Sequence, residues 1–510
     1  MPISLSSKSI SALTEKRRLS SLPIVPVSSR YLLSRFLSSR VLTSVLAIGL
    51  LAQAVTASEL PDNANPAPSI PQATAQSCGQ VPTGFRALSR RGYQQKLEGF
   101  WLGLSIANWT GLVTEMDKIG GDGPAGQVYR RDDWGKPDQP SIWGQGVPSD
   151  LSATIDWVLR GPNEVWGSDD DSDIEYIYLQ LMLQSKNPLL TGAQIRDGWL
   201  AHIYSDAETP HRTKAEHGKA AQPENFLWVS NQQAFDLMQQ GMIPPFTGLP
   251  QFNPHYDMID AQLTTELFGA LAPGRPDIAL QLAYLPIRTT ASAEAADIAQ
   301  FYVELHARAA ALPQDLTAKP ALLHQAMMQM AAQARAQLPS NQYPAKMYDF
   351  VLAQYQAGVP WEQARDALYR RYQLEQQDGY EISSKQLYCN GCFAAGINYA
   401  ASLLSYFYGE ADFQKTIKIA ALAGWDSDNP AATWGGLFGL MQGRSAIEQQ
   451  FGKALSNKFN IHRTRKGFPN QGLTDFPTMA SQGIAVIDKV VVQLMQGKVT
   501  ADGACWLIKE

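Results

Sequence analysis

The sequence predicts an all-α fold, and three of its features support this prediction. Apolar residues recur at the three- and four-residue spacing of helices from about residue 85 onward. The alternation of apolar and polar residues that marks half-buried strands is nearly absent, and no repeat of fixed period divides the chain. With 45% apolar and 17% charged residues, the chain can bury a large core. We therefore expect one compact multi-helix domain over residues 85–510.

The expected helices fill most of this domain. They cover residues 95–107, 173–186, 255–271, 276–285, 294–311, 321–337, 345–357, 361–375, 391–408, 412–423, 431–442 and 482–496. Three segments rich in Gly, Pro or charged residues are expected to be loops: 117–150, 205–225 and 241–254. Several tryptophans in or after the first loop could stack on a ring of a ligand or could be buried in the core. These are Trp134, Trp143, Trp157 and Trp166.

Residues 1–57 are expected to be a signal peptide or another targeting segment. The run 41–57 is uncharged and apolar, and small side chains at Val55 and Ala57 suit cleavage after Ala57. A membrane-spanning helix needs about 20 apolar residues, so this run is slightly short for a span. We expect export to the periplasm or secretion, with no stable membrane span after processing. An uncleaved membrane anchor at 41–57 is the alternative. Residues 58–84, rich in Pro, Ala and Ser, are expected to form a flexible linker.

The charge distribution argues against nucleic acid as a partner. The chain carries a net charge of −5, but its first 57 residues contain seven Lys or Arg and a single Glu. This segment contributes +6, so the rest of the chain carries −11. Proteins that bind nucleic acid need a basic face. The acidic remainder of the chain is therefore a poor candidate for binding nucleic acid.

The four cysteines are an even number, as expected for an exported chain. Cys389 and Cys392 form a lone CxxC motif, which lacks half of the ligands of a zinc site. A local disulfide between them is favoured over two free thiols. Cys78 and Cys505 could then join the two ends of the folded part, but the sequence does not settle this pairing.

Four carboxylates lie within the five residues Asp169–Asp173, directly before an apolar helix. The dipole of a helix favours acids at its N-terminus by about 0.3–1 kcal/mol each, but one capping Asp would satisfy that need. A hard divalent cation such as Mg²⁺ or Mn²⁺ would account for the surplus, because these ions prefer carboxylate oxygens. A solvated acidic turn without a metal is the alternative.

A second acidic turn, Asp426-Ser427-Asp428-Asn429, also precedes a helix. Pro430 suits the first helical position and Asn429 suits the N-cap. Asp426 and Asp428 alternate around a tight turn, so both can point at one ion. The helix that follows is lined with Ala and Gly, which indicates that this turn lies in a crowded interior rather than on an open surface.

A third stretch, residues 98–115, is a small-residue helix that breaks near Thr110-Gly111 and presents Glu115 on the following loop. In this order, the three stretches resemble the ADP-ribosylglycohydrolase superfamily. The family's first helix is similar to GALLGLAIGDALGAPTE, its second motif is TDDT, and its third is GGDTDT. Residues 169–172 match the second motif best, although a register that starts at Ser168 would still include two aspartates. Residues 424–429, GWDSDN, match the third motif.

The resemblance implies a binuclear site in a central cleft, with two divalent cations, usually Mg²⁺ or Mn²⁺. Its implied ligands are Asp169, Asp170, Asp171, Asp426, Asp428 and Asn429. Glu115 falls on the catalytic glutamate of the family. Three positions depart from the pattern: Asn108 replaces an Asp of the first motif, Asp169 replaces a Thr, and Asn429 replaces a Thr or Ser. The last two replacements still offer oxygen, so a site survives, although its charge and metal preference can differ.

The resemblance also implies a reaction. Two ions about 3.5–4 Å apart can chelate the 2′ and 3′ hydroxyls of a ribose and orient its anomeric carbon. A nearby carboxylate can then act as acid or base on the glycosidic bond and on the attacking water. The expected substrate is a small molecule or protein that carries an ADP-ribosyl group. The alternatives are hydrolysis of another glycoside or nucleoside, and a non-catalytic binding or structural role on the same scaffold. The sequence does not indicate an oligomeric state.

Overall fold

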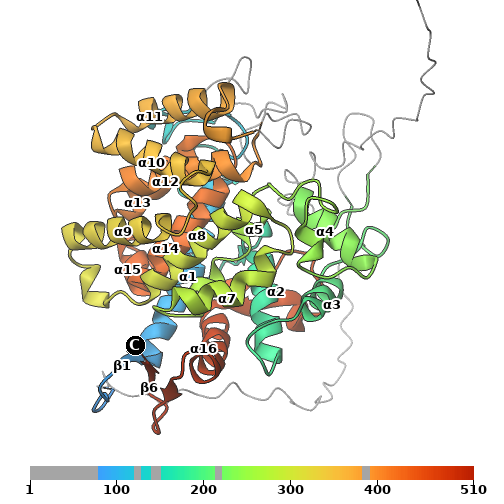
Figure 1. Cartoon of the computed structure of the whole chain (residues 1–510), viewed down its shortest axis with the longest axis vertical. Coiled ribbons are helices and arrows are strands. Elements are labelled where there is room, and N and C mark those ends of the chain that lie inside the picture. The colour runs from blue at the N-terminus through green and yellow to red at the C-terminus, as the bar shows by residue number, and fades with distance from the viewer. Residues whose placement is uncertain (1–77, 120–127, 139–150, 213–220, 382–390, 510) are drawn as a thin grey trace, which may run out of the picture.

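The structure is a computed structural model, and it describes residues 78–119, 128–138, 151–212, 221–381 and 391–509 (Figure 1). Helices make up most of this part of the chain. They are α1 (Arg90–Gly111), α2 (Asp170–Gln184), α3 (Gly192–His202), α4 (Val229–Gln239), α5 (Asp260–Leu263), α6 (Leu267–Ala270), α7 (Pro276–Ile287), α8 (Ala293–Ala310), α9 (Pro320–Arg335), α10 (Tyr343–Gln356), α11 (Trp361–Leu368), α12 (Ala395–Gly409), α13 (Phe413–Ala423), α14 (Asp428–Gln442), α15 (Arg444–Phe451) and α16 (Phe476–Gln493). Among the described residues, none of the helices combines the length and the apolar composition needed to cross a membrane.

The helical periodicity located most of these helices but not all of their breaks. The helix expected over 255–271 is divided into the single turns α5 and α6, and the one expected over 361–375 continues beyond α11 as a π-helical turn, Tyr369–Leu374. Helices α3, α4 and α15 were not expected. Helix α3 does carry a sequence signal, because Thr191 and Gln194 form a capping box at its start. Helix α15 buries only Ile447, which leaves it little apolar periodicity to detect.

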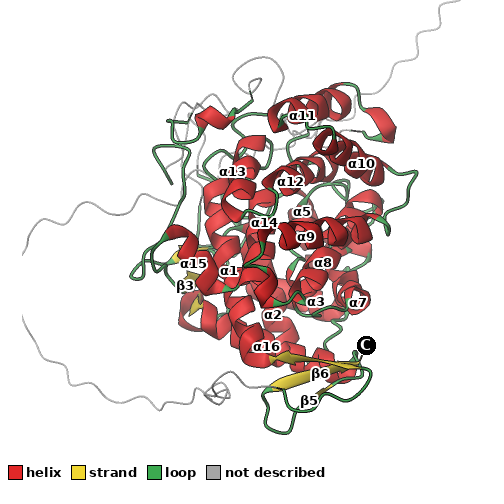
Figure 2. Ribbon diagram, turned by 90° about the vertical axis from the view of Figure 1, so that its left-hand side faces the viewer, coloured by secondary structure: helices red, strands yellow, loops and turns green. Residues whose placement is uncertain are grey.

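The described part of the chain is mostly helical, in agreement with the predicted fold class, and two small sheets accompany the helices (Figure 2). One has the antiparallel order β1 (Phe85–Ser89), β6 (Cys505–Lys509) and β5 (Lys498–Val499). The other has the order β2 (Trp166–Gly167), β3 (Lys458–Asn460) and β4 (Leu473–Asp475), with β2 parallel to β3. Strands of two to five residues are too short to show a clear alternation, so the sequence did not reveal them.

The first sheet joins the two ends of the described chain. Strand β1 pairs with β6 in a register that places Phe85 opposite Lys509 and Ser89 opposite Cys505. A disulfide between Cys78 and Cys505 lies beside this pairing, with 5.7 Å between the two Cα atoms. Cys392 is also disulfide-bonded. Its expected partner, Cys389, lies outside the described residues.

Helix α1 lies in the middle of the molecule, and its C-terminal two-thirds are buried almost completely (Figure 2). Its backbone contacts that of α14 through glycines on both helices. A Cβ atom on Gly103 would lie 2.2 Å from the carbonyl oxygen of Gly435, and one on Gly99 would lie 2.3 Å from that of Gly439. A side chain therefore cannot be added at these positions without separating the helices. This contact sets the position of the segments that follow α1 and precede α14.

A buried carboxyl pair, Glu175 and Glu266, contacts three helices: α2, α6 and α14. Glu175 on α2 accepts a hydrogen bond from the backbone N–H of Leu267 at 2.6 Å, and Glu266 accepts one from the hydroxyl of Thr433 on α14. Burial raises the pKa of Glu266 to about 8. Burial and the neighbouring Glu266 raise the pKa of Glu175 well above its ordinary value. The folded protein therefore favours the protonated, neutral form of both carboxyl groups.

The glycine contact predicts a local effect on stability. Gly103→Ala should lower the free energy of unfolding by about 1–3 kcal/mol or more, because the added methyl group overpacks the α1–α14 contact. Gly92→Ala in the same helix is the control, since its Cβ would meet only Ser89 at 3.5 Å. That variant should be neutral or up to about 1 kcal/mol more stable. Denaturant unfolding of both variants measures the difference, and equal stabilities would contradict the proposed contact.

The carboxyl pair predicts a pH dependence. Between pH 4.5 and about 8, Glu266 ionises in the unfolded chain but remains protonated in the folded one. The free energy of unfolding should therefore fall as the pH rises, by about 1.4 kcal/mol per pH unit for each such proton. Glu266→Gln should make this slope shallower when unfolding is measured from pH 5.5 to 7.5 without metal.

Glu410→Gln serves as the control for this slope. The hydrogen bond from Lys415 lowers the pKa of Glu410, so this group is ionised in both states throughout that pH range. Its substitution should leave the slope unchanged. A slope that is the same in Glu266→Gln as in the parent would show that Glu266 does not hold a proton in the fold.

Candidate functional site

The C-terminal end of α1 leads directly to Glu115. The helix ends at Gly111, where a Cβ atom would lie 2.4 Å from the Cα atom of Asp428. Only glycine therefore allows α1 to approach the second acidic turn so closely. Thr114 then donates a hydrogen bond from its hydroxyl to the carbonyl oxygen of Ala421 at 2.5 Å. This bond fixes the turn that carries Glu115 against the end of α13.

The backbone that follows Glu115 is hydrogen-bonded to the backbone that precedes Asp426. The N–H of Met116 donates to the carbonyl oxygen of Trp425 at 2.9 Å, and the N–H of Trp425 donates to that of Lys118 at 3.2 Å. Met116 and Trp425 both have left-handed backbones, with φ of 60° and 59°. Such conformations cost free energy in residues with a side chain, and they persist where the surroundings enforce them. Both strained residues adjoin an acid of the candidate site.

The second acidic turn is held by backbone and hydroxyl contacts. Ser427, rather than Asn429, occupies the N-cap of α14, and its hydroxyl bonds to the carbonyl oxygen of Gly111 at 3.1 Å. Asn429 lies inside the first turn of the helix, and its side-chain oxygen accepts a hydrogen bond from Gln262 at 2.7 Å. The expected capping role of Asn429 is therefore wrong, because the helix begins at Asp428, two residues before Pro430.

Glu115, Asp426 and Asp428 form a cluster of buried acids. One carboxylate oxygen from each lies within 4.8 Å of the others. Their exposed fractions are 9%, 2% and 0%. Three carboxylates that are confined so closely and shielded from water repel one another strongly. Their oxygens are the ligands that hard divalent cations prefer, so the cluster could hold a metal ion.

The first acidic turn reaches the same end of α1. Strand β2 delivers it, since the N–H of Ser168 donates to the carbonyl oxygen of Asn460 at 3.1 Å. The side-chain amide of Asn108 on α1 donates to Asp169 at 3.3 Å, and both residues are buried. Asp170 is buried as well, whereas the side chain of Asp171 lies outside the described part. The two acidic turns thus meet α1 within one helical turn of each other, at Asn108 and at Gly111.

Asn398 on α12 holds the backbone of Asp426. Its side-chain oxygen accepts a hydrogen bond from the N–H of Asp426 at 3.2 Å. Its amide group donates to the carbonyl oxygens of Cys392 and Ala394, at 2.6 and 3.0 Å. Asn398 is fully buried. Asn398 could not be selected from the sequence, because a single Asn in an apolar helix belongs to no motif.

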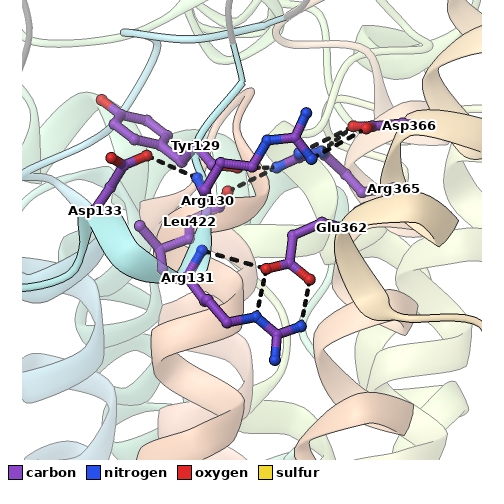
Figure 3. A network of polar contacts seen from close by, with 8 residues as sticks. All are labelled: Tyr129, Arg130, Arg131, Asp133, Glu362, Arg365, Asp366 and Leu422. Carbon is purple, nitrogen blue, oxygen red and sulfur yellow. Dashed lines mark hydrogen bonds and ion pairs between the residues drawn. The ribbon is translucent and has the colours of Figure 1, made fainter.

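A network of arginines joins residues 129–133 to α11 and to Leu422 near the end of α13 (Figure 3). Arg131 makes a two-pronged contact with Glu362 on α11, at 2.6 and 2.5 Å. The fully buried Arg365 donates to the carbonyl oxygens of Tyr129 and Leu422, at 2.7 and 3.3 Å. Leu422 lies in the last turn of α13, just before the Asp426 turn. Positive charge at the end of a helix interacts favourably with its exposed carbonyl groups.

Asp117, two residues after Glu115, forms a second pair of buried acids with Asp138. Burial and the neighbouring carboxyl group of Asp138 raise the pKa of Asp117 to about 9. Tyr129 donates a hydrogen bond to Asp138 at 2.7 Å. This pair therefore ties part of the loop expected over 117–150 to the segment that carries Glu115.

The described tryptophans near the acidic turns have structural contacts. Trp166 is fully buried, and its indole N–H donates to the carbonyl oxygen of Ser456 at 3.0 Å. Trp134 and Trp157 pack edge to face against each other, with 5.4 Å between ring centroids. Trp157 also stacks on Phe413. Trp166 therefore fits burial in the core rather than stacking on a ligand. Trp143 lies outside the described residues.

Two comparisons with known proteins give a match. The sequence model of the ADP-ribosylglycohydrolase family matches residues 89–477, most of the chain. The fold is also similar to a solved structure described as an "ADP-ribosylglycohydrolase-related protein complex". That similarity has a TM-score of 0.40 and 17% sequence identity, and it covers 78% of this chain and 98% of the other. No curated protein matches the chain.

The family match contains the end of α1, both acidic turns and Glu115, and so confirms the resemblance seen in their motifs. A family model that covers this much of the chain is specific, and the chain belongs to the ADP-ribosylglycohydrolase family.

Proposed function

We propose that the protein is a metal-dependent hydrolase that cleaves the glycosidic bond of an ADP-ribosyl or related ribosyl substrate. The observation that carries this proposal is the buried cluster of Glu115, Asp426 and Asp428, whose oxygens lie within 4.8 Å of one another. The family is generally hydrolytic, which supports the reaction type. The cluster supplies the carboxylates that such a reaction needs.

The donor set fits hard divalent cations. Asp169, Asp170 and Asp171 would supply one ligand set of a two-ion site, and Asp426, Asp428 and Asn429 would supply the other. The fit rests on the chemistry of these groups, because buried carboxylates at such short separations are stabilised when a cation lies between them. Bound Mg²⁺ or Mn²⁺ would bind the ribose hydroxyls and offset the negative charge of the site.

Glu115 is the proposed catalytic residue. Its carboxylate belongs to the cluster, and Glu115 follows a helix end that is fixed through Gly111 and Thr114. This anchoring would hold the carboxylate at one distance from the anomeric carbon. Glu115 would accept a proton from the attacking water or donate one to the leaving group, a role that typically contributes about 10²–10⁴ in rate. The backbone contacts of Met116 with Trp425 keep Glu115 and Asp426 in register.

We also propose that the folded part works outside the cytoplasm, after export and cleavage following Ala57. The disulfide between Cys78 and Cys505 supports an oxidising location. The targeting segment itself lies outside the described residues. A small molecule or an ADP-ribosylated protein that reaches this compartment would be the substrate.

Metal binding can be measured directly. The double variant Asp426→Asn, Asp428→Asn keeps the shape of both side chains but removes two charges, so its affinity for Mn²⁺ should fall at least tenfold. Calorimetry and elemental analysis of the folded protein measure affinity and stoichiometry. Asp475→Asn, an acid that caps α16 through the N–H of Thr478, is the control and should bind as the parent does. Full Mn²⁺ occupancy in the double variant would refute the assignment of these ligands.

Catalysis depends on Glu115 in this proposal. At saturating Mn²⁺, Glu115→Gln should lower kcat by about 10²–10⁴, because the amide can neither accept nor donate the required proton. The assay uses ADP-ribosylated arginine and serine peptides and small ADP-ribosides. Glu98→Gln, near the other end of α1, should retain the activity of the parent.

Two outcomes of this assay would count against the proposal. A Glu115→Gln variant as active as the parent would remove Glu115 from the mechanism. If the parent binds metal but turns over none of these substrates, the ADP-ribosyl specificity is wrong, and another glycoside or a binding role becomes the better hypothesis.

A further inference from the structure

We propose that Arg465 is a positioning residue for the first acidic turn, and that it acts through its buried ion pair with Asp173. The inference rests on the proposed function, because it concerns the same metal site. It assigns different roles to the acids of residues 169–173: Asp173 orients the helix, and the acids before it remain for the cation.

The ion pair is completely shielded from water. A guanidinium nitrogen of Arg465 lies 2.7 Å from a carboxylate oxygen of Asp173, and both side chains have exposed fractions of 0%. The same guanidinium donates to the backbone carbonyl oxygens of Asn225 and Phe226, at 2.7 and 3.0 Å. It also donates to the hydroxyl of Thr464 at 2.9 Å. A planar guanidinium that is held at several points has a fixed position, and its positive charge attracts the carboxylate of Asp173.

Asp173 transmits this constraint to the acidic turn. Its backbone N–H donates to the carbonyl oxygen of Asp169 at 3.0 Å, across the first turn of α2. A rotation of this helical turn would break the contact with Arg465.

The ion pair also explains the surplus of acids in the sequence. Asp173 faces a cation of the protein itself, whereas Asp169 faces the side-chain amide of Asn108 at the end of α1. An amide orients a carboxylate without neutralising it. The ion pair thus accounts for Asp173 within the protein, and the acids before it are the ones that belong to the proposed metal site.

A neighbouring arginine offers a matched comparison. Arg463 pairs with Glu224 at 2.5 Å and thus holds the same segment, residues 224–226, to the same stretch of chain. His462 stacks on Phe226 within this contact, with 4.0 Å between ring centroids. Arg465 bonds to α2 through Asp173, whereas the ion pair of Arg463 is with Glu224. Replacing one pair or the other therefore separates an effect on the acidic turn from an effect on segment 224–226.

Stability alone does not explain a buried ion pair. Replacing both partners with apolar residues of similar size is often neutral or stabilising, because the desolvation of two charges offsets their attraction. A double replacement also leaves the net charge of the protein unchanged, so it does not alter the overall attraction of the site for a cation. Loss of metal affinity in such a variant would report on the geometry of the turn.

The test compares the double variant Arg465→Met, Asp173→Leu with the control Arg463→Met, Glu224→Met. Calorimetry and Mn²⁺ electron paramagnetic resonance of the full folded protein measure affinity and the environment of the ion. Thermal unfolding in EDTA measures stability without metal. The first variant should bind Mn²⁺ at least tenfold more weakly and with an altered spectrum, while a cooperative unfolding transition shows that it is folded. The control should bind Mn²⁺ within twofold of the parent.

The outcomes distinguish this inference from the proposed function. If the parent binds Mn²⁺ and the Arg465→Met, Asp173→Leu variant binds it equally well with the same spectrum, the positioning role is refuted. If the parent itself does not bind Mn²⁺, the proposed metal site fails instead. Should the double variant not fold, Arg465→Lys provides a second test. Lysine keeps the positive charge but lacks the forked guanidinium group of arginine. Its Mn²⁺ affinity should be reduced, and an affinity equal to that of the parent would also refute the inference.

Discussion

The close contact between α1 and α14 is the constraint on which the site depends. Glycines let the two backbones approach to a distance that no side chain would allow. The approach continues to the end of α1, where Gly111 touches the backbone of Asp428. Because α1 ends there, Glu115 emerges beside the turn that precedes α14. The distance between the proposed catalytic acid and the second acidic turn is therefore set by main-chain packing, which is stiffer than any pair of side chains.

The sequence predicted the parts of the site that lie in contiguous motifs. Asp426 and Asp428 are two residues apart before a small-residue helix, and Glu115 follows a helix break, so local patterns were enough to select them. The structure brings these three acids into one cluster. Most helices were also predictable, since each buries a continuous apolar face. The small-residue pattern of α14 correctly indicated that its acidic turn lies in the interior.

What the sequence could not show depends on contacts between distant segments. Asn398 lies 28 residues before Asp426, and Arg465 lies 292 residues after Asp173, so no spacing rule relates them. A buried Asn or Arg also resembles an ordinary polar residue until its partners are known. The strands could not be predicted for a related reason. Strand β2 has two residues, and it forms because β3 lies beside it. Such features follow from the assembled fold and leave no local periodicity.

The pairing of β1 with β6 has a consequence for biosynthesis. Strand β1 leaves the ribosome long before its partner exists, because Cys78 and Cys505 are 427 residues apart. Helix α1 follows β1 directly, and its own main partner, α14, is also made late. The centre of the molecule therefore stays incomplete during most of translation, and contacts of such long range are slow to form. Such a nascent chain would depend on molecular chaperones that shield its apolar helices until strand β6 is made.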